Sequence, residues 1–269
     1  MIATFEVVGP RIERSFEAPT MAASSALLPQ GAYTTLRTFG GSRVVRLREH
    51  VRRLTSSIDG ATAFASLEEA AVRDAIAQVL RATGHVETRL RLTFAPPRLF
   101  VSSESFAPLP PSFYELGVSC VTVPLSRKNP KAKDTRFASE AERAYKALPP
   151  GVHEGLLVSG TDILEGLSSN FFACHAGTLR TEEARALDGV TRSMVLEVAA
   201  AVVPVLRDAI RLDELPRVSE SFLTSASRGI LPVVAIDAVS LGSGRPGPLN
   251  ARLTKLFDEL VEREAEDLG

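Results

Sequence analysis

The sequence is poor in cysteine, in lysine and in long apolar runs. These shortages exclude some classes of protein and shorten the list of candidate reactive residues. Two cysteines, Cys120 and Cys174, are too few and too far apart for a disulfide framework or a zinc site, so we interpret Cys174 as a small buried apolar residue. Nothing approaches the length of a membrane span, and charged residues interrupt the first sixteen positions, unlike a signal peptide. We therefore expect a cytoplasmic protein with no membrane segment and no metal.

The charge balance excludes a further class of partner. The formal net charge is −1, and no basic block is present that could follow a nucleic-acid backbone. With 45% apolar and 23% charged residues, the composition is typical of a globular protein. A chain of 269 residues can form two modest cores, and its partner is expected to be a small molecule or another subunit.

An amine that can lose its proton is available at few positions. Arginine accounts for most of the 31 basic residues and stays charged, so only the five lysines remain. These are Lys128, Lys131, Lys133, Lys146 and Lys255.

Strand-like and helix-like patterns alternate in both halves of the chain. Three prolines, Pro108, Pro110 and Pro111, interrupt the pattern, which favours two domains of mixed α/β (α+β) type at 1–115 and 116–269. A capping box at Ser66 and Glu69 predicts the start of a helix that ends at Gly84, and Gly40-Gly41 predicts a hairpin. Other helices are expected at 48–58, 138–148, 191–202 and 250–266, and strands at 2–8, 33–39, 43–47, 87–94, 99–103, 118–123, 155–159, 170–174, 220–224 and 232–239.

One glycine motif suggests a dinucleotide site but lacks the necessary context. Residues 242–247 read Gly-Ser-Gly-Arg-Pro-Gly, which matches the fingerprint letter by letter. The fingerprint also requires a helix opening within it and a further strand with an acidic residue. Because prolines lie in the turn and only one helix of chain remains, we expect a loop leading into the last helix.

Two neighbouring segments carry more information. In 163–172 the carboxylate of Glu165 ends an apolar strand, and a Gly-Leu-Ser-Ser-Asn turn leads to Asn170. In 187–199 Gly189 and Thr191 precede an apolar helix, whose free N–H groups and dipole would attract a phosphate. Thr191 alone would also be explained as a helix cap.

These segments give the chain a resemblance to the class IV, fold-type IV, pyridoxal-phosphate enzymes. That group includes branched-chain and D-amino-acid aminotransferases, (R)-selective amine transaminases and aminodeoxychorismate lyases. The resemblance implies the two-domain D-amino-acid aminotransferase-like fold and pyridoxal 5′-phosphate as cofactor. Its landmarks occur in the expected order at 31–37, 49–54, 163–172, 187–199, 220–233 and 242–247.

The resemblance also selects a lysine. D-amino-acid aminotransferases place the Schiff-base lysine 32 residues before the glutamate, and Lys133 lies 32 before Glu165. Lys131 fits the longer spacing of branched-chain enzymes and remains the second candidate. By resemblance, Lys133 would form the internal aldimine and then move the α-proton as a free base. Glu154 stands where the family places an acid before its strand.

The same resemblance assigns roles around the cofactor. Glu165 would keep the pyridine nitrogen protonated so that the ring acts as an electron sink, with Asn170 bracing its loop. The phosphate would be bound by the side chains of Arg53 and Thr191 and by the backbone N–H groups of Val190 and Thr191. The family's usual Ser or Thr in 220–233 is Ala226 here, so Ser225 or Ser227 would substitute for it.

The substrate side is less defined. Tyr33 and Arg37 are candidates to line it, and Arg89, Arg91, Arg98 and Arg136 are candidates to bind a carboxylate. Residues 134–137 lack the tyrosine of branched-chain enzymes, which makes typical branched-chain activity less expected. Thr34 and the short chain resemble some lyases, whereas the missing Leu-Asn pair after the lysine does not.

Three functions therefore stay open. A transaminase would move an amino group from an amino acid or primary amine to a 2-keto acid, and it is the preferred interpretation. A lyase of the 4-amino-4-deoxychorismate type would release pyruvate without an acceptor, and a non-enzymatic homologue would bind no cofactor. The resemblance also implies a homodimer with active sites at the interface.

Overall fold

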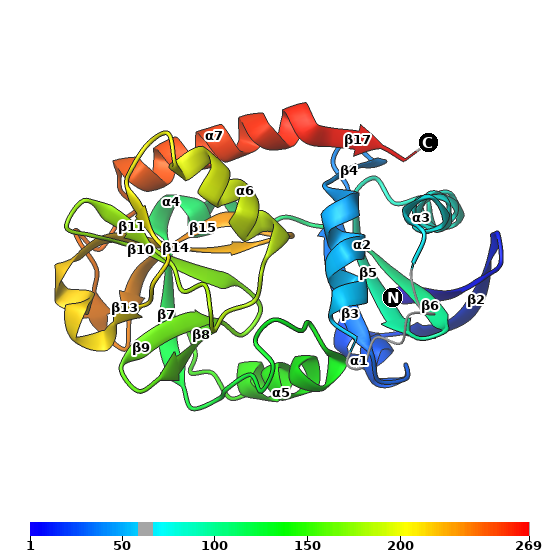
Figure 1. Cartoon of the computed structure of the whole chain (residues 1–269), viewed down its shortest axis with the longest axis horizontal. Helices are drawn as coiled ribbons and strands as arrows, with labels where there is room; N and C mark the ends of the chain where they lie inside the picture. Colours follow the sequence, from blue (N-terminus) through cyan, green and yellow to red (C-terminus); the bar gives the residue numbers. More distant parts are fainter. Residues whose placement is uncertain (59–66, 269) are drawn as a thin grey trace. The chain divides into compact units, whose positions relative to one another are not determined.

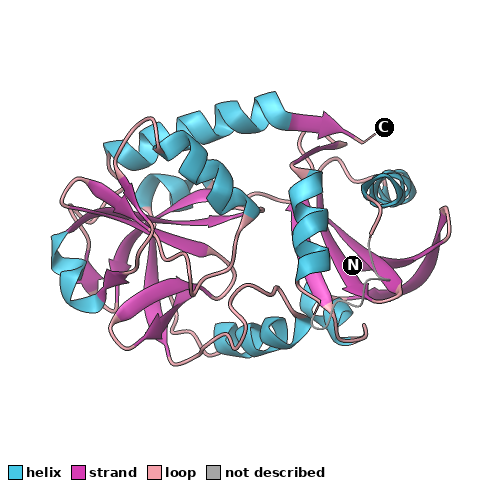
Figure 2. Ribbon diagram, in the orientation of Figure 1, coloured by secondary structure: helices cyan, strands magenta, loops and turns pink. Residues whose placement is uncertain are grey.

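The computed structural model describes residues 1–58 and 67–268, and the chain divides into two units (Figure 1). The N-terminal unit comprises residues 1–107, 132–139 and the C-terminal residues from 264 onwards. The C-terminal unit comprises residues 108–131 and 140–263. The predicted mixture of helices and strands in both halves is confirmed (Figure 2). The boundary at 115/116 stays a prediction, although contacts place the Lys133 segment in the N-terminal unit.

The N-terminal unit is built on a five-stranded antiparallel sheet. Its strand order is β2-β1-β6-β5-β3, with β2 at Arg11–Ala18, β1 at Ile2–Val8, β6 at Arg98–Ser105, β5 at Thr88–Ala95 and β3 at Ala32–Arg37. Three helices accompany it: α1 (Met21–Ala26), α2 (Leu47–Ser56) and α3 (Glu69–Thr83). Helix α2 buries Leu47, Val51 and Leu54 in the core and exposes Arg48 and Arg52 on its opposite face, as an amphipathic helix should.

The start predicted for α3 at Ser66 lies outside the described residues. Within them the helix begins at Glu69, and Gly84 ends it in the left-handed conformation, as the sequence predicts.

The hairpin predicted at Gly40-Gly41 is wrong in its strand pairing. Both glycines adopt positive φ, and Phe39 pairs with Arg43 across the turn. However, β4 (Arg43–Val45) pairs with β17 (Ala265–Asp267), whereas β3 pairs with β5. On the edge of β3 that does not pair with β5, Ala32 forms a bridge with Asp134, so β4 does not extend the sheet there. The turn is local, but the partner of each strand is decided by distant segments.

The C-terminal unit contains a ten-stranded mixed sheet. Its order is β12-β11-β10-β14-β15-β7-β8-β9-β13, with β16 attached to β15. The pairs β15–β7, β7–β8 and β11–β12 are parallel. The strands are β7 (Val118–Val123), β8 (Val152–Ser159), β9 (Asp162–Gly166), β10 (Asn170–His175), β11 (Thr178–Arg180), β12 (Val205–Leu206), β13 (Ile210–Arg211), β14 (Val218–Ser225), β15 (Gly229–Ile236) and β16 (Val239–Ser240).

Four α-helices and a 3₁₀ helix accompany these strands. They are α4 (Pro111–Leu116), α5 (Thr135–Lys146), which begins in the N-terminal unit, α6 (Val190–Ala199), α7 (Pro248–Glu264) and η1 (Leu212–Arg217). The core packs strand residues such as Leu156, Leu223 and Leu231 with the apolar side chains of neighbouring elements. Both cysteines are buried and unbridged, which fits the interpretation of Cys174 as a small apolar residue.

The glycine motif at 242–247 forms a loop before α7, as expected. A Cβ on Gly242 would lie 2.0 Å from Ser219 O, and one on Gly247 would lie 2.4 Å from Glu220 Cδ. The Glu220 carboxylate accepts hydrogen bonds from the backbone N–H groups of Leu249 and Asn250, at 3.0 and 2.8 Å. It therefore caps the N-terminus of α7, and Gly247 makes room for that cap, whereas Gly242 allows the loop to pass close to the backbone of Ser219.

Two further findings concern residues 1–58 and 67–268. No helix in these ranges is long and apolar enough to cross a membrane. The same residues contain no cluster of three or more His, Cys, Asp or Glu side chains suited to a metal ion.

Candidate active site

Lys133 is held along β3 of the N-terminal unit. The Tyr33 N–H donates to Lys133 O at 2.8 Å, and the Lys133 N–H donates to Ser57 Oγ at 3.0 Å. Its Nζ lies 5.0 Å from the centre of the Tyr33 ring, within cation–π range. Hydrogen bonds therefore hold both the backbone N–H and the backbone C=O of Lys133. Of the predicted substrate-side residues, Tyr33 lies beside the Lys133 amine.

The environment of Lys133 differs from that of the other four lysines, all of which lie in the described part of the chain. Lys133 is partly buried, whereas the other four are exposed. Lys131, the second candidate, donates to Asp188 Oδ1 at 2.7 Å and to Glu183 O. Lys146 and Lys255 lie near glutamates on their own helices. Burial and contacts thus distinguish Lys133 from every alternative.

A series of hydrogen bonds in the same unit holds the side chain of Arg53 in place. Arg53 Nη2 donates to Thr34 Oγ1 at 2.7 Å, and that oxygen lies 2.8 Å from His50 Nδ1. Burial, together with the positive charges of Arg53 and Lys133, lowers the pKa of His50 well below its ordinary value. His50 is therefore neutral at pH 7, and Thr34 links it to the predicted phosphate-binding arginine.

Glu165 lies at the end of β9 in the C-terminal unit, and its carboxylate is buried among donors. Oε1 accepts from Arg127 Nε at 2.9 Å, while Oε2 accepts from Leu187 N at 3.0 Å and Asn170 Nδ2 at 3.3 Å. The side chains of Arg127 and Glu165 are 5% and 3% exposed. A carboxylate has about four acceptor positions, so roughly one remains for a further donor such as a pyridinium N–H.

Asn170 braces this turn, as the family resemblance implies. Its Nδ2 also donates to Leu187 O at 2.8 Å, which ties the segment before α6 to the start of β10. A Cβ on Gly189 would lie 2.1 Å from Asn170 Oδ1, so only glycine fits there without a shift. Glu165, Asn170 and Gly189 therefore form one packed corner.

Helix α6 begins at this corner, directly after Gly189. The N–H of Ser193 donates to Gly189 O at 2.9 Å, so the N–H groups of Val190 and Thr191 precede the regular helical ladder. Thr191 is buried, at 8% exposure, and Gly189 is the N-cap residue but makes no side-chain cap. These N–H groups and the Thr191 hydroxyl suit the phosphate of pyridoxal phosphate.

Ser225 and Ala226 lie in the turn between β14 and β15, and both are partly buried. Ser225 Oγ accepts a hydrogen bond from Arg228 Nε at 3.0 Å. Because β14 pairs with β10 and Asn170 faces Thr224, this turn follows directly from the strand that adjoins the Glu165 corner. The C-terminal unit thus brings together all its predicted cofactor residues at the ends of adjacent elements.

The arginines predicted for the substrate side are spread over the N-terminal unit, with Arg37 as a lining residue and Arg91 as a carboxylate candidate. Arg91 donates to Ser25 Oγ at 2.7 Å, and its guanidinium lies 4.8 Å from the Tyr33 ring centre. Arg37 lies over the rings of Phe39 and Phe106, at 4.2 and 4.8 Å.

The other three arginines are less directly placed for that role. Arg98 makes two hydrogen bonds to Glu6, Arg89 pairs with Glu104, and Arg136 is exposed. Arg91 is therefore the candidate whose placement beside Tyr33 best suits the substrate side.

The sequence analysis did not identify two arginines that pair with buried acids of the C-terminal unit. Arg127 and Arg228 bind acidic partners 38 and 74 positions away in the chain. The signal available was the buried acids themselves, because an acid with no local partner requires a distant cation.

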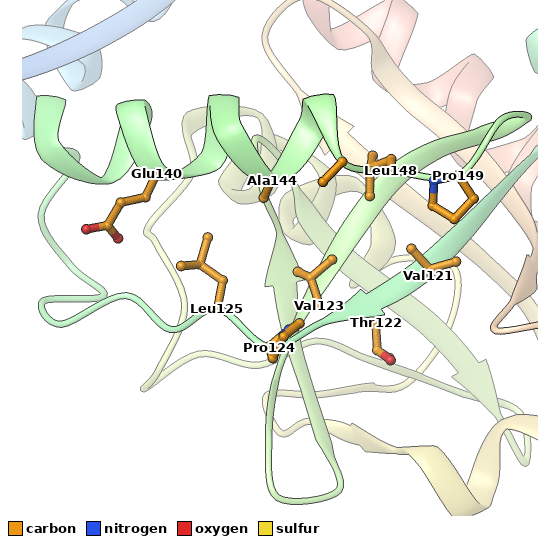
Figure 3. A pocket seen from close by; sticks show the side chains of 10 residues that line it. Val121, Thr122, Val123, Pro124, Leu125, Glu140, Ala144, Leu148 and Pro149 are labelled. Atoms are coloured by element: carbon orange, nitrogen blue, oxygen red, sulfur yellow. The ribbon is translucent and has the colours of Figure 1, made fainter.

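A pocket of about 480 Å³ lies elsewhere in the C-terminal unit, between β7 and α5 (Figure 3). Its lining is almost wholly apolar, with Glu140 as its one charged residue, and contains none of the predicted site residues.

Comparison with known proteins identifies the family. The family model for class IV aminotransferases matches residues 31–236, and the chain belongs to that family. It is 29% identical to a probable branched-chain-amino-acid aminotransferase of Thermotoga maritima, over 86% of this chain and 87% of the relative. It is 25% identical to a putative one of Methanocaldococcus jannaschii, over 87% and 88%.

A solved structure shares the fold. A branched-chain aminotransferase from the archaeon Thermoproteus uzoniensis, crystallised with norvaline, superposes with a TM-score of 0.80 at 21% identity, over 99% of each chain. The fold-type IV prediction is confirmed. The chain is a pyridoxal-phosphate-dependent aminotransferase, and the lyase alternative is not favoured.

Proposed function

We propose that Lys133 is the lysine that holds pyridoxal phosphate as a Schiff base. The observation that carries this assignment is its environment: it is partly buried, fixed through its backbone and beside Tyr33, whereas the other lysines are exposed. When bound, the cofactor supplies an electron sink for the carbanion left by removal of the α-proton. Lys133 Nζ would be the base that removes that proton, and it would return the proton at the neighbouring carbon.

The C-terminal unit supplies the polar contacts of the cofactor in this proposal. Glu165 accepts the pyridine N–H, and its bonds to Arg127, Asn170 and Leu187 N keep it in place. The phosphate is bound by the N–H groups of Val190 and Thr191 and by the Thr191 hydroxyl.

Two further side chains complete the phosphate side. Ser225 contributes a hydroxyl next to Ala226, where relatives commonly have Ser or Thr. Arg53 of the N-terminal unit adds a positive charge oriented by Thr34.

The proposed reaction moves an amino group from an amino acid or primary amine to a 2-keto acid. The relatives' names point to branched-chain amino acids as the first donors to test. Position 137 is a buried phenylalanine, so the family tyrosine that touches the cofactor's phenolic oxygen has no counterpart there. We therefore propose a donor range that differs from typical branched-chain enzymes. We also propose a homodimer with interface active sites, located in the cytoplasm.

Borohydride trapping tests the lysine assignment. Protein loaded with pyridoxal phosphate is reduced, digested and mapped, and the phosphopyridoxyl group is expected on Lys133. The Lys133→Ala variant should lose the yellow absorbance and essentially all amino transfer, whereas Lys131→Ala, the matched control, should retain both. A label on Lys131, or coloured and active Lys133→Ala protein, would refute the assignment.

An amino-donor screen tests the substrate proposal. Purified protein is mixed with L- and D-amino acids and with primary amines, and loss of the yellow absorbance reports the first half-reaction. A 2-keto acid added afterwards should restore the colour. Pyruvate release without any acceptor would instead favour the lyase.

A further inference from the structure

A buried polar network contacts two turns that carry candidate cofactor residues of the C-terminal unit. Its centre is Glu154 on β8, whose side chain is 0% exposed. The carboxylate accepts hydrogen bonds from Arg228 Nη2 at 3.0 Å, from Ser169 Oγ at 3.1 Å and from Ser168 Oγ at 3.2 Å. The Tyr145 hydroxyl also donates to it. Four side chains from three other segments therefore converge on one carboxylate.

Arg228 connects this carboxylate to two turns. Its Nη2 also donates to Ser168 Oγ at 2.9 Å, and its Nε donates to Ser225 Oγ at 3.0 Å. Its own carbonyl oxygen accepts from the Tyr114 hydroxyl at 3.0 Å. The guanidinium therefore spans from the turn at 225–228 to the turn at 167–169, and its planar fork fixes the direction of each bond.

The two turns carry groups that the proposed function assigns to the cofactor. The first contains Ser225 and Ala226, and the second connects Glu165 to Asn170. Strands β10 and β14 pair as far as Asn170 and Thr224, where that ladder ends. Beyond this pair, the side chains of Arg228 and Glu154 connect the turn after β14 to the turn before β10.

Stability alone is a poor explanation for this network. Removing two charges from water is costly for each ion, so a buried pair often adds little net stability compared with apolar side chains. What the pair does supply is a fixed geometry. The turns it joins are the places where small displacements would misalign groups that must contact one ligand.

We propose that Arg228 and Glu154 are positioning residues that lock the Ser225–Arg228 turn to the Leu167–Asn170 turn, so that the two sets of cofactor contacts act as one preformed site. This inference rests on the proposed function, because it needs both turns to face the cofactor. Neither residue is required to touch the cofactor itself.

The test measures the affinity of the apoprotein for pyridoxal phosphate by fluorescence titration, together with urea unfolding. Arg228→Met breaks the pair, and Arg228→Lys keeps a charge near Glu154 but cannot reproduce the fork. The matched control is Arg180→Met, because Arg180 is 14% exposed against 13% for Arg228 and also pairs with a carboxylate, at 2.9 Å to Glu214 Oε1. Each variant is titrated only under conditions in which its urea unfolding curve shows that it is folded.

We expect both Arg228 variants to raise the Kd for pyridoxal phosphate at least ~tenfold, while Arg180→Met changes it less than about twofold. The double variant Arg228→Met/Glu154→Gln, which leaves no buried charge, should regain stability but not affinity. If Arg228→Met does not fold, Arg228→Lys and the double variant decide the question.

The outcomes separate this inference from the proposed function. A Kd close to that of wild type in folded Arg228 variants would overturn the positioning role and leave the proposed function intact. A wild-type apoprotein that takes up no pyridoxal phosphate would overturn both.

Discussion

Acidification should lower the free energy of unfolding of this protein, because the imidazole of His50 is buried in an uncharged form. His50 is 4% exposed, shares a hydrogen bond with Thr34, and has a pKa lowered well below its ordinary value by burial and by the charges of Arg53 and Lys133. In the unfolded chain the same side chain titrates near about pH 6.5. Below that pH the unfolded state binds a proton that the native state does not, so stability falls as pH decreases.

The magnitude follows from this difference in proton binding. While the native state stays unprotonated, the free energy of unfolding lost is RT ln(1 + 10^(6.5 − pH)), which is about 1.4 kcal/mol at pH 5.5 and under about 0.1 kcal/mol at pH 7.5. The interval avoids the carboxylates, such as Glu182 and Glu214, whose lowered pKa values matter only at more acidic pH. His153 also has a lowered pKa, from burial and from Arg228, and adds a smaller change of the same sign.

Urea unfolding of the apoprotein at pH 7.5 and 5.5 measures the effect, with His50→Asn as the comparison. An asparagine oxygen can accept from the Thr34 hydroxyl near the former Nδ1 position but does not titrate. Wild type should lose about 1 kcal/mol more than His50→Asn over this interval, and His153→Asn should retain most of the wild-type loss. Equal losses in wild type and His50→Asn would refute the reasoning.

Three further predictions concern the C-terminal unit. Arg127→Met should lower the free energy of unfolding by about 3–5 kcal/mol in urea titrations, because Glu165 would keep a buried charge without its ion pair. Gly189→Ala should displace Asn170, whose Oδ1 would lie 2.1 Å from the new Cβ, and cost about 1–3 kcal/mol together with weaker cofactor uptake by absorbance titration. Glu220→Gln should lose about 0.5–1 kcal/mol of stability by thermal unfolding, because a neutral cap interacts less with the dipole of α7.

Local patterns in the sequence predicted the strand end and the helix start that carry candidate site residues of the C-terminal unit. The apolar run before Glu165 indicated a buried strand end, and the glycine before Thr191 indicated a helix start; both are present. These features depend on residues a few positions apart, where hydrogen bonding and periodicity act directly. Family spacing then supplied the choice of Lys133, which local patterns could not make.

Contacts between distant segments could not be predicted in the same way. Nothing near Arg228 in the sequence indicates that it meets Glu154, and nothing near β3 indicates that Lys133 lies along it rather than the strand after Gly40-Gly41. Each strand or buried charge has several possible partners in the sequence. The choice among them depends on which pairing completes the whole sheet or core.

The exposure of the lysines gives the site assignment support that spacing alone cannot give. Spacing to Glu165 separates Lys133 from Lys131 by two residues, a difference that one insertion or deletion in a loop could reverse. Burial does not depend on that count: Lys131 is exposed and bound to Asp188, whereas Lys133 is partly buried beside Tyr33. A lysine that must lose its proton gains from partial exclusion of water and loses from an acidic partner. Spacing and burial are independent properties of these two lysines, and both favour Lys133.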